Sequence, residues 1–537
     1  MLLDGIARHI FPRTPPILID GPSGSSAIHH LDTSNIFHVH RVSSCDSDKR
    51  MSSCAVSARL QPLLTTELTG RVVTINILPD NVLLHIFHSY RSTYLDGPDQ
   101  FDLLWSWRWR RLAHVCQRWR AVVFASPNFL DLRLLFDPWT RVELTDIWPP
   151  LPTIIRNMAD CPMPEDYDFD AATVHHNHVY EIDLFYLTNS QLQRLASAMQ
   201  KQFPALTHLL LESAYDCRPA TALPDGFLGG FAPRLQSLEL YSIPFPTLPK
   251  LLLSATDLVY LTLSNIPHSG YISPEVIVTG LAVLVNLRTL TLDFESPRSR
   301  PDRKNRRPPP PIRTVLPSLT RFGFHGVSEY LEDLVARIDA PLLDSIRIDF
   351  FHQLIFDIPQ LAQFMRRMTG FMAIDEIHVV FDDYGVRVEC IPPTMTFDKT
   401  SRLRISCRWL DWQLSSLEQV FTSFFPSIHM VEYLYIYTCQ YSSSRQQDDI
   451  ENTHWLESLH PFTAVTNLYI CEETAQSIAP ALQDLVGERA IDVLPALENF
   501  YWEELQPRRP VREAFGQFIA ARELLGRPVA ISNWNRR

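Results

Sequence analysis

The residues that could do chemistry in this 537-residue chain are histidines, cysteines and carboxylates, and none of them stands in a catalytic or metal-binding pattern. The nine cysteines include no pair with the two-residue gap of a zinc knuckle or a redox dithiol. GPSGSS, at residues 21–26, lacks the Gly-Lys-Ser/Thr ending of a phosphate loop. The chain also lacks a G-x-S-x-G elbow, an H-E-x-x-H pair and a dinucleotide glycine fingerprint. We therefore expect a protein that is not an enzyme, with no catalytic residues, no bound metal and no cofactor.

Four histidines near the N-terminus are the nearest approach to a metal site. His29, His30, His38 and His40 could bind an ion if a fold brought them together. However, residues 1–70 combine Ser, His and Pro with little apolar periodicity, which predicts a disordered tail. We favour the interpretation that these histidines are flexible.

Charge limits the partners that the chain can attract. The net charge is -12 and the pI is about 5.9, so we do not expect nucleic acid or an anionic membrane as a partner. Residues 105–120 interleave tryptophans with arginines, a composition that could suit single-stranded nucleic acid. Their helical spacing favours a core or a protein interface instead. No apolar run approaches the roughly 20 residues that span a bilayer.

The elements that position these residues begin with a helical block at residues 78–129. Pro79 and Asp80 suit the first turn of a helix, because proline has no N–H to satisfy and a carboxylate favours the positive end of the helix dipole. Apolar residues then recur at helical spacing through Tyr90. A break at Asp96–Pro98 precedes two further helical runs, which end at Ser126-Pro127. So small a block encloses little core, and its remaining apolar surface should contact a partner or the following domain.

This block resembles an F-box of the type common in mushroom-forming (basidiomycete) fungi. The resemblance rests on the Leu-Pro opening, the Ile-Phe pair and Val-Cys-x-x-Trp-Arg before the Ser-Pro stop. A long insert at residues 91–110 departs from the simplest pattern. The resemblance implies that the block docks on the Skp-type adaptor of an SCF ubiquitin ligase, which a cullin scaffold carries. The residues implied to contact the adaptor are Leu78, Pro79, Val82, Leu83, Ile86, Phe87, Val115, Cys116 and Trp119.

The rest of the chain repeats one short motif. FPALTHLLLES, APRLQSLELYS and LPALENFYWEE share the pattern L-x-x-L-x-L, with Phe and Trp in place of the last two leucines in the third copy and a proline two residues before the first leucine in each. The alternation predicts a short strand with one buried face, and helical runs separate the copies. Spacings of 23 to 34 residues between anchors approximate a leucine-rich repeat, although the copies near residues 374, 403, 431 and 465 are degenerate. An ordinary doubly wound parallel sheet is the alternative, but it would not need so many copies.

The predicted fold is therefore α/β, with an N-terminal helical F-box-like domain followed by a leucine-rich-repeat solenoid. Parallel strands would line its concave face and helices its convex face. We assign residues 71–150 to the F-box-like domain and its junction. The solenoid follows at residues 170–537, with a basic proline-rich loop at 297–313 and a C-terminal cap at 510–537.

The side chains that alternate with the buried leucines should face away from the core. In the middle repeats they carry mixed charges, such as Arg347, Asp349, Arg402 and Arg404. Towards the C-terminus they include tyrosines, which supply contact area and a hydroxyl at low entropic cost. We predict that an unknown target protein binds these tyrosines, unless they pack under the last helix. They are Tyr433, Tyr435, Tyr437, Tyr469 and Tyr501.

Together these features predict a substrate-recognition adaptor in the cytoplasm or nucleus. It would hold a target on its repeats while its F-box-like block docks on a ligase. A repeat scaffold that works without a ligase is one alternative. A nuclear regulator that acts through the basic loop at residues 297–313 is another, although such a run is more often a solvated loop.

Overall fold

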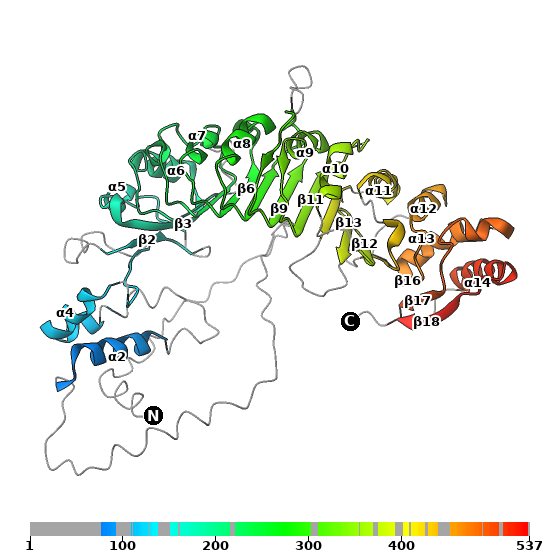
Figure 1. Cartoon of the computed structure of the whole chain (residues 1–537), viewed down its shortest axis with the longest axis horizontal. Coiled ribbons are helices and arrows are strands. Elements are labelled where there is room, and N and C mark those ends of the chain that lie inside the picture. Colours follow the sequence, from blue (N-terminus) through cyan, green and yellow to red (C-terminus); the bar gives the residue numbers. More distant parts are fainter. Residues whose placement is uncertain are drawn as a thin grey trace, which may run out of the picture. The chain divides into compact units, whose positions relative to one another are not determined.

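The computed structural model describes most of the chain from residue 77 to residue 534 (Figure 1). The described ranges are 77–92, 109, 111–127, 129–137, 151–158, 162–214, 221–301, 310–353, 355–368, 374–391, 401–407, 410–424, 428–438, 452–485, 487–503 and 509–534. The predicted tail at residues 1–70, the insert except for residues 91, 92 and 109, and the centre of the basic loop lie outside these ranges.

A long sheet, mostly parallel, runs through the described residues. Its strands follow the order β1-β2-β3-β4-β5-β6-β7-β9-β11-β14-β13-β12-β15-β16-β17-β18. Their bounds are β1 Leu134–Phe136, β2 Thr153–Arg156, β3 Val179–Leu187, β4 His208–Ser213, β5 Ser237–Tyr241, β6 Tyr260–Ile266, β7 Thr289–Phe294, β9 Arg321–Gly326, β11 Ser345–Phe351, β12 Glu376–Asp382, β13 Gly385–Ile391, β14 Ser401–Ser406, β15 Tyr433–Thr438, β16 Asn467–Ile470, β17 Asn499–Glu503 and β18 Ala530–Trp534. A separate pair joins β8 (Thr314–Val315) to β10 (Ile338–Asp339).

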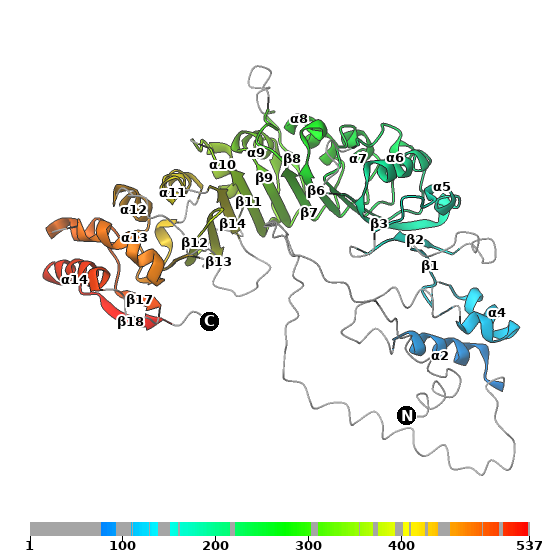
Figure 2. The same ribbon diagram turned by 180° about the vertical axis from the view of Figure 1, so that it is seen from behind.

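Helices lie along one face of this sheet, as both views show (Figures 1 and 2). They are α5 Phe169–Ala172, α6 Asn189–Ala198, α7 Leu248–Leu252, α8 Pro274–Leu281, α9 Ser328–Val335, α10 Pro359–Arg367, α11 Leu410–Phe424, α12 Asn452–Leu459, α13 Glu472–Gln483 and α14 Arg509–Leu524. From α7 onward each helix packs on the next one in the chain. The side chains of the opposite face of the sheet are therefore the ones available to a ligand.

The predicted alternation places the core between the sheet and these helices. In β4 and β7 every second residue is buried, and Leu209, Leu211, Leu290 and Leu292 are at most 1% exposed. Burial of these leucines removes apolar area from water, which stabilises the fold by about 25 cal/mol per Å² of buried area. The residues that alternate with these leucines lie on the opposite face of the sheet.

The proline of the motif occupies a turn. The N–H of Leu235 donates to the carbonyl of Ala232 at 3.2 Å, with Pro233 in the second position of the turn. Proline is favoured there because its fixed φ matches the turn. An equivalent hydrogen bond, from the N–H of the anchor to the carbonyl three residues earlier, is present at Leu206, Leu319, Leu343 and Leu497. The motif therefore marks both the end of one connection and the start of the next strand.

One part of the sheet corrects the predicted all-parallel arrangement. β12 and β13 form an antiparallel hairpin, and β13 also pairs antiparallel with β14. The two-residue turn Asp383-Tyr384 can join only antiparallel strands, because a parallel crossover needs a dozen residues or more. Gly385 fits because a Cβ at this position would lie 2.2 Å from the carbonyl oxygen of Ile405. The array is thus interrupted by an inserted hairpin.

The hairpin also corrects the register of one degenerate repeat. The sequence pattern predicts that Leu403 is the first anchor of a repeat. In the structure Leu403 pairs with Ile348, which is the last apolar residue of its own motif. Arg402 and Arg404 nevertheless fall on the predicted face, because they pair with Arg347 and Asp349. The two-residue period kept the face correct although the motif position was wrong.

Both ends of the sheet include strands that carry no copy of the repeat motif. β1 and β2 already belong to the sheet, so it begins before residue 170, the predicted first residue of the repeats. At the other end α14 packs on α13, and β18 pairs with β17 as the last strand in the order of the sheet.

Candidate functional site

The helical block is held at its start by Arg118. α2 spans Asp80–Ser92 and α4 spans Gln117–Ala125. The Arg118 guanidinium donates to Asp80 Oδ1 at 2.6 and 2.9 Å and to the Leu78 carbonyl at 2.5 Å. Asp80 lies in the first turn of α2, where it also favours the helix dipole. This contact fixes the Leu-Pro opening against α4.

Cys116 begins α4 as its N-cap. Its backbone is extended, and its sulfur accepts a hydrogen bond from the Trp119 N–H at 3.4 Å. A capping side chain satisfies one of the donors that a helix start leaves without a partner. The predicted adaptor-contact residue therefore also has a structural role, which the sequence pattern did not indicate.

Three of the nine predicted adaptor-contact residues lie inside the block. Leu83, Phe87 and Trp119 are 0%, 1% and 3% exposed, and the rings of Phe87 and Trp119 pack at 4.8 Å between centroids. Side chains buried in this way cannot touch a partner directly in this structure. The contact between Phe87 and Trp119 joins α2 to α4, so in this structure these three residues belong to the interior of the block.

The other six predicted contact residues keep some accessible surface. Val82 is 38% exposed and Val115 is 45% exposed, although both are aliphatic. Pro79 is exposed as well, and partial exposure remains at Leu78, Ile86 and Cys116. An apolar surface of this kind, on a block with so small a core, is suited to a protein partner.

Trp109 is a structural residue whose role the sequence left open. It is 0% exposed, and its indole N–H donates to the carbonyl of Arg133 at 3.1 Å. Its ring also packs against Phe124. The residue thus ties the end of the insert to the segment that leads into β1. The arginine and tryptophan alternation around it gave no signal that separates a buried tryptophan from an exposed one.

The predicted tyrosines come together on the face opposite the helices. β15, β16 and β17 pair in register, so Tyr435 lies beside Tyr469 and Tyr469 beside Tyr501. Their rings stack with centroids 4.1 and 4.3 Å apart and planes within 10° and 5° of parallel. Tyr433 and Tyr437 flank Tyr435 on the same face of β15. All five are partly exposed, so they do not pack under the last helix.

Two further residues complete this surface. Trp534, on β18, contacts Tyr435 and Tyr469 edge-on at 5.7 and 5.5 Å. His378, on β12, packs on Tyr435 at 4.3 Å, and its Nε2 lies 2.5 Å from Glu376 Oε1. Burial raises the pKa of the Tyr435 hydroxyl, and the Glu376 carboxylate adds to that effect. The alternation of the last strand could have indicated Trp534, but no repeat motif marked it.

A second group of side chains on this face is rich in arginine. Arg347 lies directly opposite Arg402, and Arg387 directly opposite Arg404. Like charges in this position disfavour strand pairing. Carboxylates offset the repulsion: Arg402 and Arg387 reach Glu389 at 2.9 and 3.0 Å. Arg347 likewise pairs with Asp349, and Arg404 with Asp382. Arg387 and Glu389 were not predicted, because β13 carries no repeat motif.

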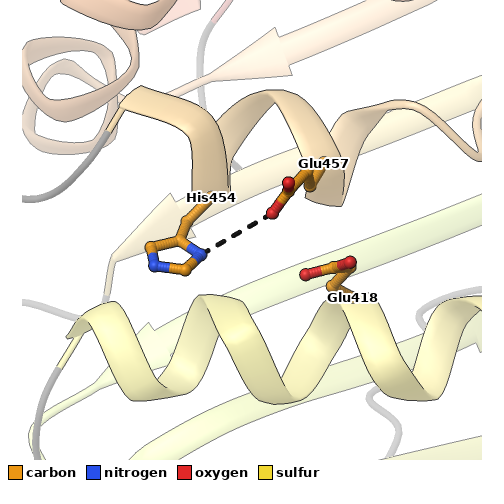
Figure 3. A group of neighbouring side chains, drawn as sticks. All are labelled: Glu418, His454 and Glu457. Carbon is orange, nitrogen blue, oxygen red and sulfur yellow. Dashed lines mark ion pairs between the residues drawn. The ribbon is translucent and has the colours of Figure 1, made fainter.

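A cluster of potential metal ligands lies among the helices. Figure 3 shows Glu418 on α11 facing His454 and Glu457 on α12. Their ligand atoms lie within 4.8 Å of one another, and His454 Nδ1 is 3.8 Å from Glu457 Oε2. Burial and the nearby Glu457 carboxylate raise the pKa of Glu418. Within the described residues nothing beyond the cluster itself points to a ligand, so we assign it no function.

One comparison with known proteins supports the predicted domain at the N-terminal helical block. A family model described as F-box-like matches residues 75–128, so the chain contains an F-box-like domain there. A search of curated proteins finds no match. In the described part of the chain no helix has both the length and the apolar character needed to cross a membrane.

The solved structures that match include a repeat protein. One is the crystal structure of the leucine-rich repeat-containing protein LegL7 from Legionella pneumophila. It is 10% identical over 72% of this chain and 97% of its own, with a TM-score of 0.24. A similarity of this size carries no argument about function, and the description of the repeats rests on the strands themselves.

Proposed function

We propose that this protein is the substrate-recognition adaptor of an SCF-type ubiquitin ligase, with no catalytic activity of its own. The F-box-like domain at residues 75–128 is the observation that carries the proposal. F-box domains bind Skp-type adaptors, and such an adaptor would connect this chain to a cullin scaffold. The exposed Val82 and Val115 support the proposal, because they offer apolar surface for that contact.

The repeats would hold the target. We propose that the chain from β3 to β18 is a leucine-rich-repeat solenoid whose free face binds a protein. The stacked tyrosines support this choice of face, because they place aromatic area and hydroxyl groups on partly exposed strands. Holding a target beside the ligase raises its effective concentration at the ubiquitin carrier. Such an adaptor would work in the cytoplasm or the nucleus, and its F-box would be of the basidiomycete type.

Co-purification tests this proposal directly. Tagged full-length protein, expressed with a Skp-type adaptor and a cullin, should retain both through washing. A protein that is folded by circular dichroism but retains neither would contradict the proposal. That outcome would leave the two alternatives that do not involve a ligase, which are a repeat scaffold and a nuclear regulator.

A further inference from the structure

Four rings form a continuous stack on the free face of the sheet. His378, Tyr435, Tyr469 and Tyr501 occupy one register position on β12, β15, β16 and β17. The centroid separations along the stack are 4.3, 4.1 and 4.3 Å, and successive tyrosine planes lie within 10° and 5° of parallel. Each of the two inner rings therefore has a neighbour on both faces. We call these four residues the ring ladder.

The ring ladder stops one strand before the last strand of the sheet. β18 follows β17, and its residue in register with Tyr501 is Ser532. A serine side chain ends at its hydroxyl, so it cannot cover a phenol ring. Ser532 is exposed and Tyr501 is partly exposed. Within the described residues, the face of Tyr501 that is turned towards β18 thus ends the ladder.

Trp534 does not take the next position in the ladder, although it lies on β18 and faces the same side as Ser532. Its indole contacts Tyr435 and Tyr469, with centroids 5.7 and 5.5 Å away and planes inclined at 61° and 71°. The indole therefore crosses the edges of the two inner rings. The outer face of Tyr501 is left for a ring from another molecule.

The surroundings of this ring face do not call for a charged ligand. β12, β15, β16, β17 and β18 contain no lysine and no arginine, so these strands offer no cation to an acidic ligand. Glu376 is bonded to His378 at 2.5 Å, at the far end of the ladder. Glu503 lies with Cys471 and Glu473 and has a contact of its own. A basic ligand would compete with these contacts, whereas an uncharged ring uses neither carboxylate.

An aromatic side chain of a peptide fits this arrangement. Paired rings add about two- to tenfold in affinity beyond the apolar area that they bury. Asn499 precedes Tyr501 by two residues on the same face of β17, and it is partly exposed. Its residue in register on β18 is Ala530, which is small, so a peptide backbone can approach the Asn499 amide.

We propose that the outer face of Tyr501 binds an aromatic side chain of the target protein, which adds the next ring to the ladder above Ser532. This inference rests on the proposed function, of which it specifies the side chain that the repeats recognise. Phenylalanine, tyrosine and tryptophan supply such a ring. The backbone beside that residue crosses β18 and meets the amide of Asn499.

Filling this position from within the chain tests the proposal. S532F places a ring of the protein's own beside Tyr501, and a cross-strand aromatic pair stabilises a sheet, so the variant should melt no lower than the wild type. The probes are phage-displayed random peptides of about twelve residues, which in extended form cross several strands. They are panned against the immobilised full-length protein. The enriched peptides should share an aromatic residue, and S532F should bind them at least about tenfold more weakly.

S264F is the matched control. Ser264, on β6, is partly exposed and lies in register with Tyr241 on β5, so this variant also adds a ring beside a tyrosine of the free face. It should bind the enriched peptides as the wild type does. A second measurement replaces the shared aromatic residue of a peptide by leucine, which keeps an apolar side chain but removes the ring. Wild-type protein should bind that peptide about fivefold more weakly, and this test stands if S532F does not fold.

Four outcomes overturn the proposal. They are an absence of enrichment, enrichment of peptides that share no aromatic residue, equal binding by folded S532F, and equal binding of the leucine peptide. Weakened binding by S264F to the same extent as by S532F would place the contact elsewhere and overturn it too. Capture of a Skp-type adaptor by the same preparations shows whether a failure concerns the recognised side chain alone or the proposed function.

Discussion

Arg118 and Asp80 join α4 to the first turn of α2, with the guanidinium 2.6 Å from the carboxylate oxygen. The same guanidinium holds the Leu78 carbonyl. Two positions that are 38 residues apart thereby fix the Leu-Pro opening, which is the start of the surface proposed to meet the adaptor.

Arg118→Ala should loosen this opening without unfolding the repeats. The ion pair is largely exposed, and such pairs contribute about 0–1 kcal/mol, so we expect up to about fivefold faster amide exchange in the first turns of α2. Hydrogen–deuterium exchange with mass spectrometry measures this. Arg111→Ala is the control, because Arg111 is exposed and lies between α2 and α4 in the sequence. Equal exchange in the two variants would show that the contact has no stabilising effect.

Cys116 should be replaceable by serine but not by alanine. Serine is a favourable N-cap, whereas removing a capping side chain costs about 1 kcal/mol. We expect Cys116→Ala to increase amide exchange in α4 about fivefold and Cys116→Ser to leave it unchanged. If both variants lose adaptor capture while α4 stays protected, the thiol contacts the partner and capping is not its main role.

Arg522 should be essential to the C-terminal repeats. It is 0% exposed, and it donates to the carbonyls of Ala490 at 3.0 Å and Leu497 at 3.2 Å, in the connection before β17. Arg522→Ala leaves buried carbonyls without donors and should cost about 3 kcal/mol or more. Protection of β17 and β18 against exchange should fall accordingly, whereas the exposed Arg527→Ala should not change it. Unchanged protection in Arg522→Ala would contradict this role.

Asp183 should make the first repeats sensitive to pH. Burial raises its pKa to about 6, and Glu181 and Glu239 add to the effect while Arg156 opposes it. A raised carboxyl pKa means that the folded state binds the proton more tightly. The stabilisation is therefore complete below about pH 4 and disappears as pH rises through about 6, and it amounts to at most about 3 kcal/mol.

Asp183→Asn removes this dependence. Its free energy of unfolding in urea, relative to the wild type, should increase from pH 4 to pH 7.5. The exposed Asp257→Asn, measured at the same pH values, is the control for the loss of one surface carboxylate. If Asp183→Asn differs from the wild type by the same amount at both pH values, the Asp183 carboxyl titrates as it does in the unfolded chain.

The repeats were predictable because one short motif carries two independent signals. The alternation in LTHLLLES and its equivalents fixes which side chains are buried, and the proline fixes the turn before each strand. The same alternation predicted the face of the strands on which the five tyrosines lie. The β12–β13 hairpin was missed because its signal, a short turn before Gly385, is local and resembles a loop between repeats.

In the helical block, spacing alone could not separate buried from exposed apolar residues. Leu83 and Val82 are neighbours in one apolar run, yet only Leu83 is fully buried. That difference depends on where α4 packs on α2, a contact between residues far apart in the chain. The burial of Trp109 depends on its contacts with Phe124 and Arg133, whereas the capping role of Cys116 is a local contact with the N–H of Trp119.

Capture of a Skp-type adaptor by a surface variant tests most directly whether the F-box-like block docks on that adaptor. Val82→Glu combined with Val115→Glu places charge on the exposed apolar surface without altering the core of the block. Val276→Glu on α8, where the valine is 48% exposed, is the matched control. Surface plasmon resonance with purified adaptor should give at least about tenfold weaker binding for the double variant and wild-type binding for the control. Wild-type affinity in a folded double variant would contradict docking through this surface.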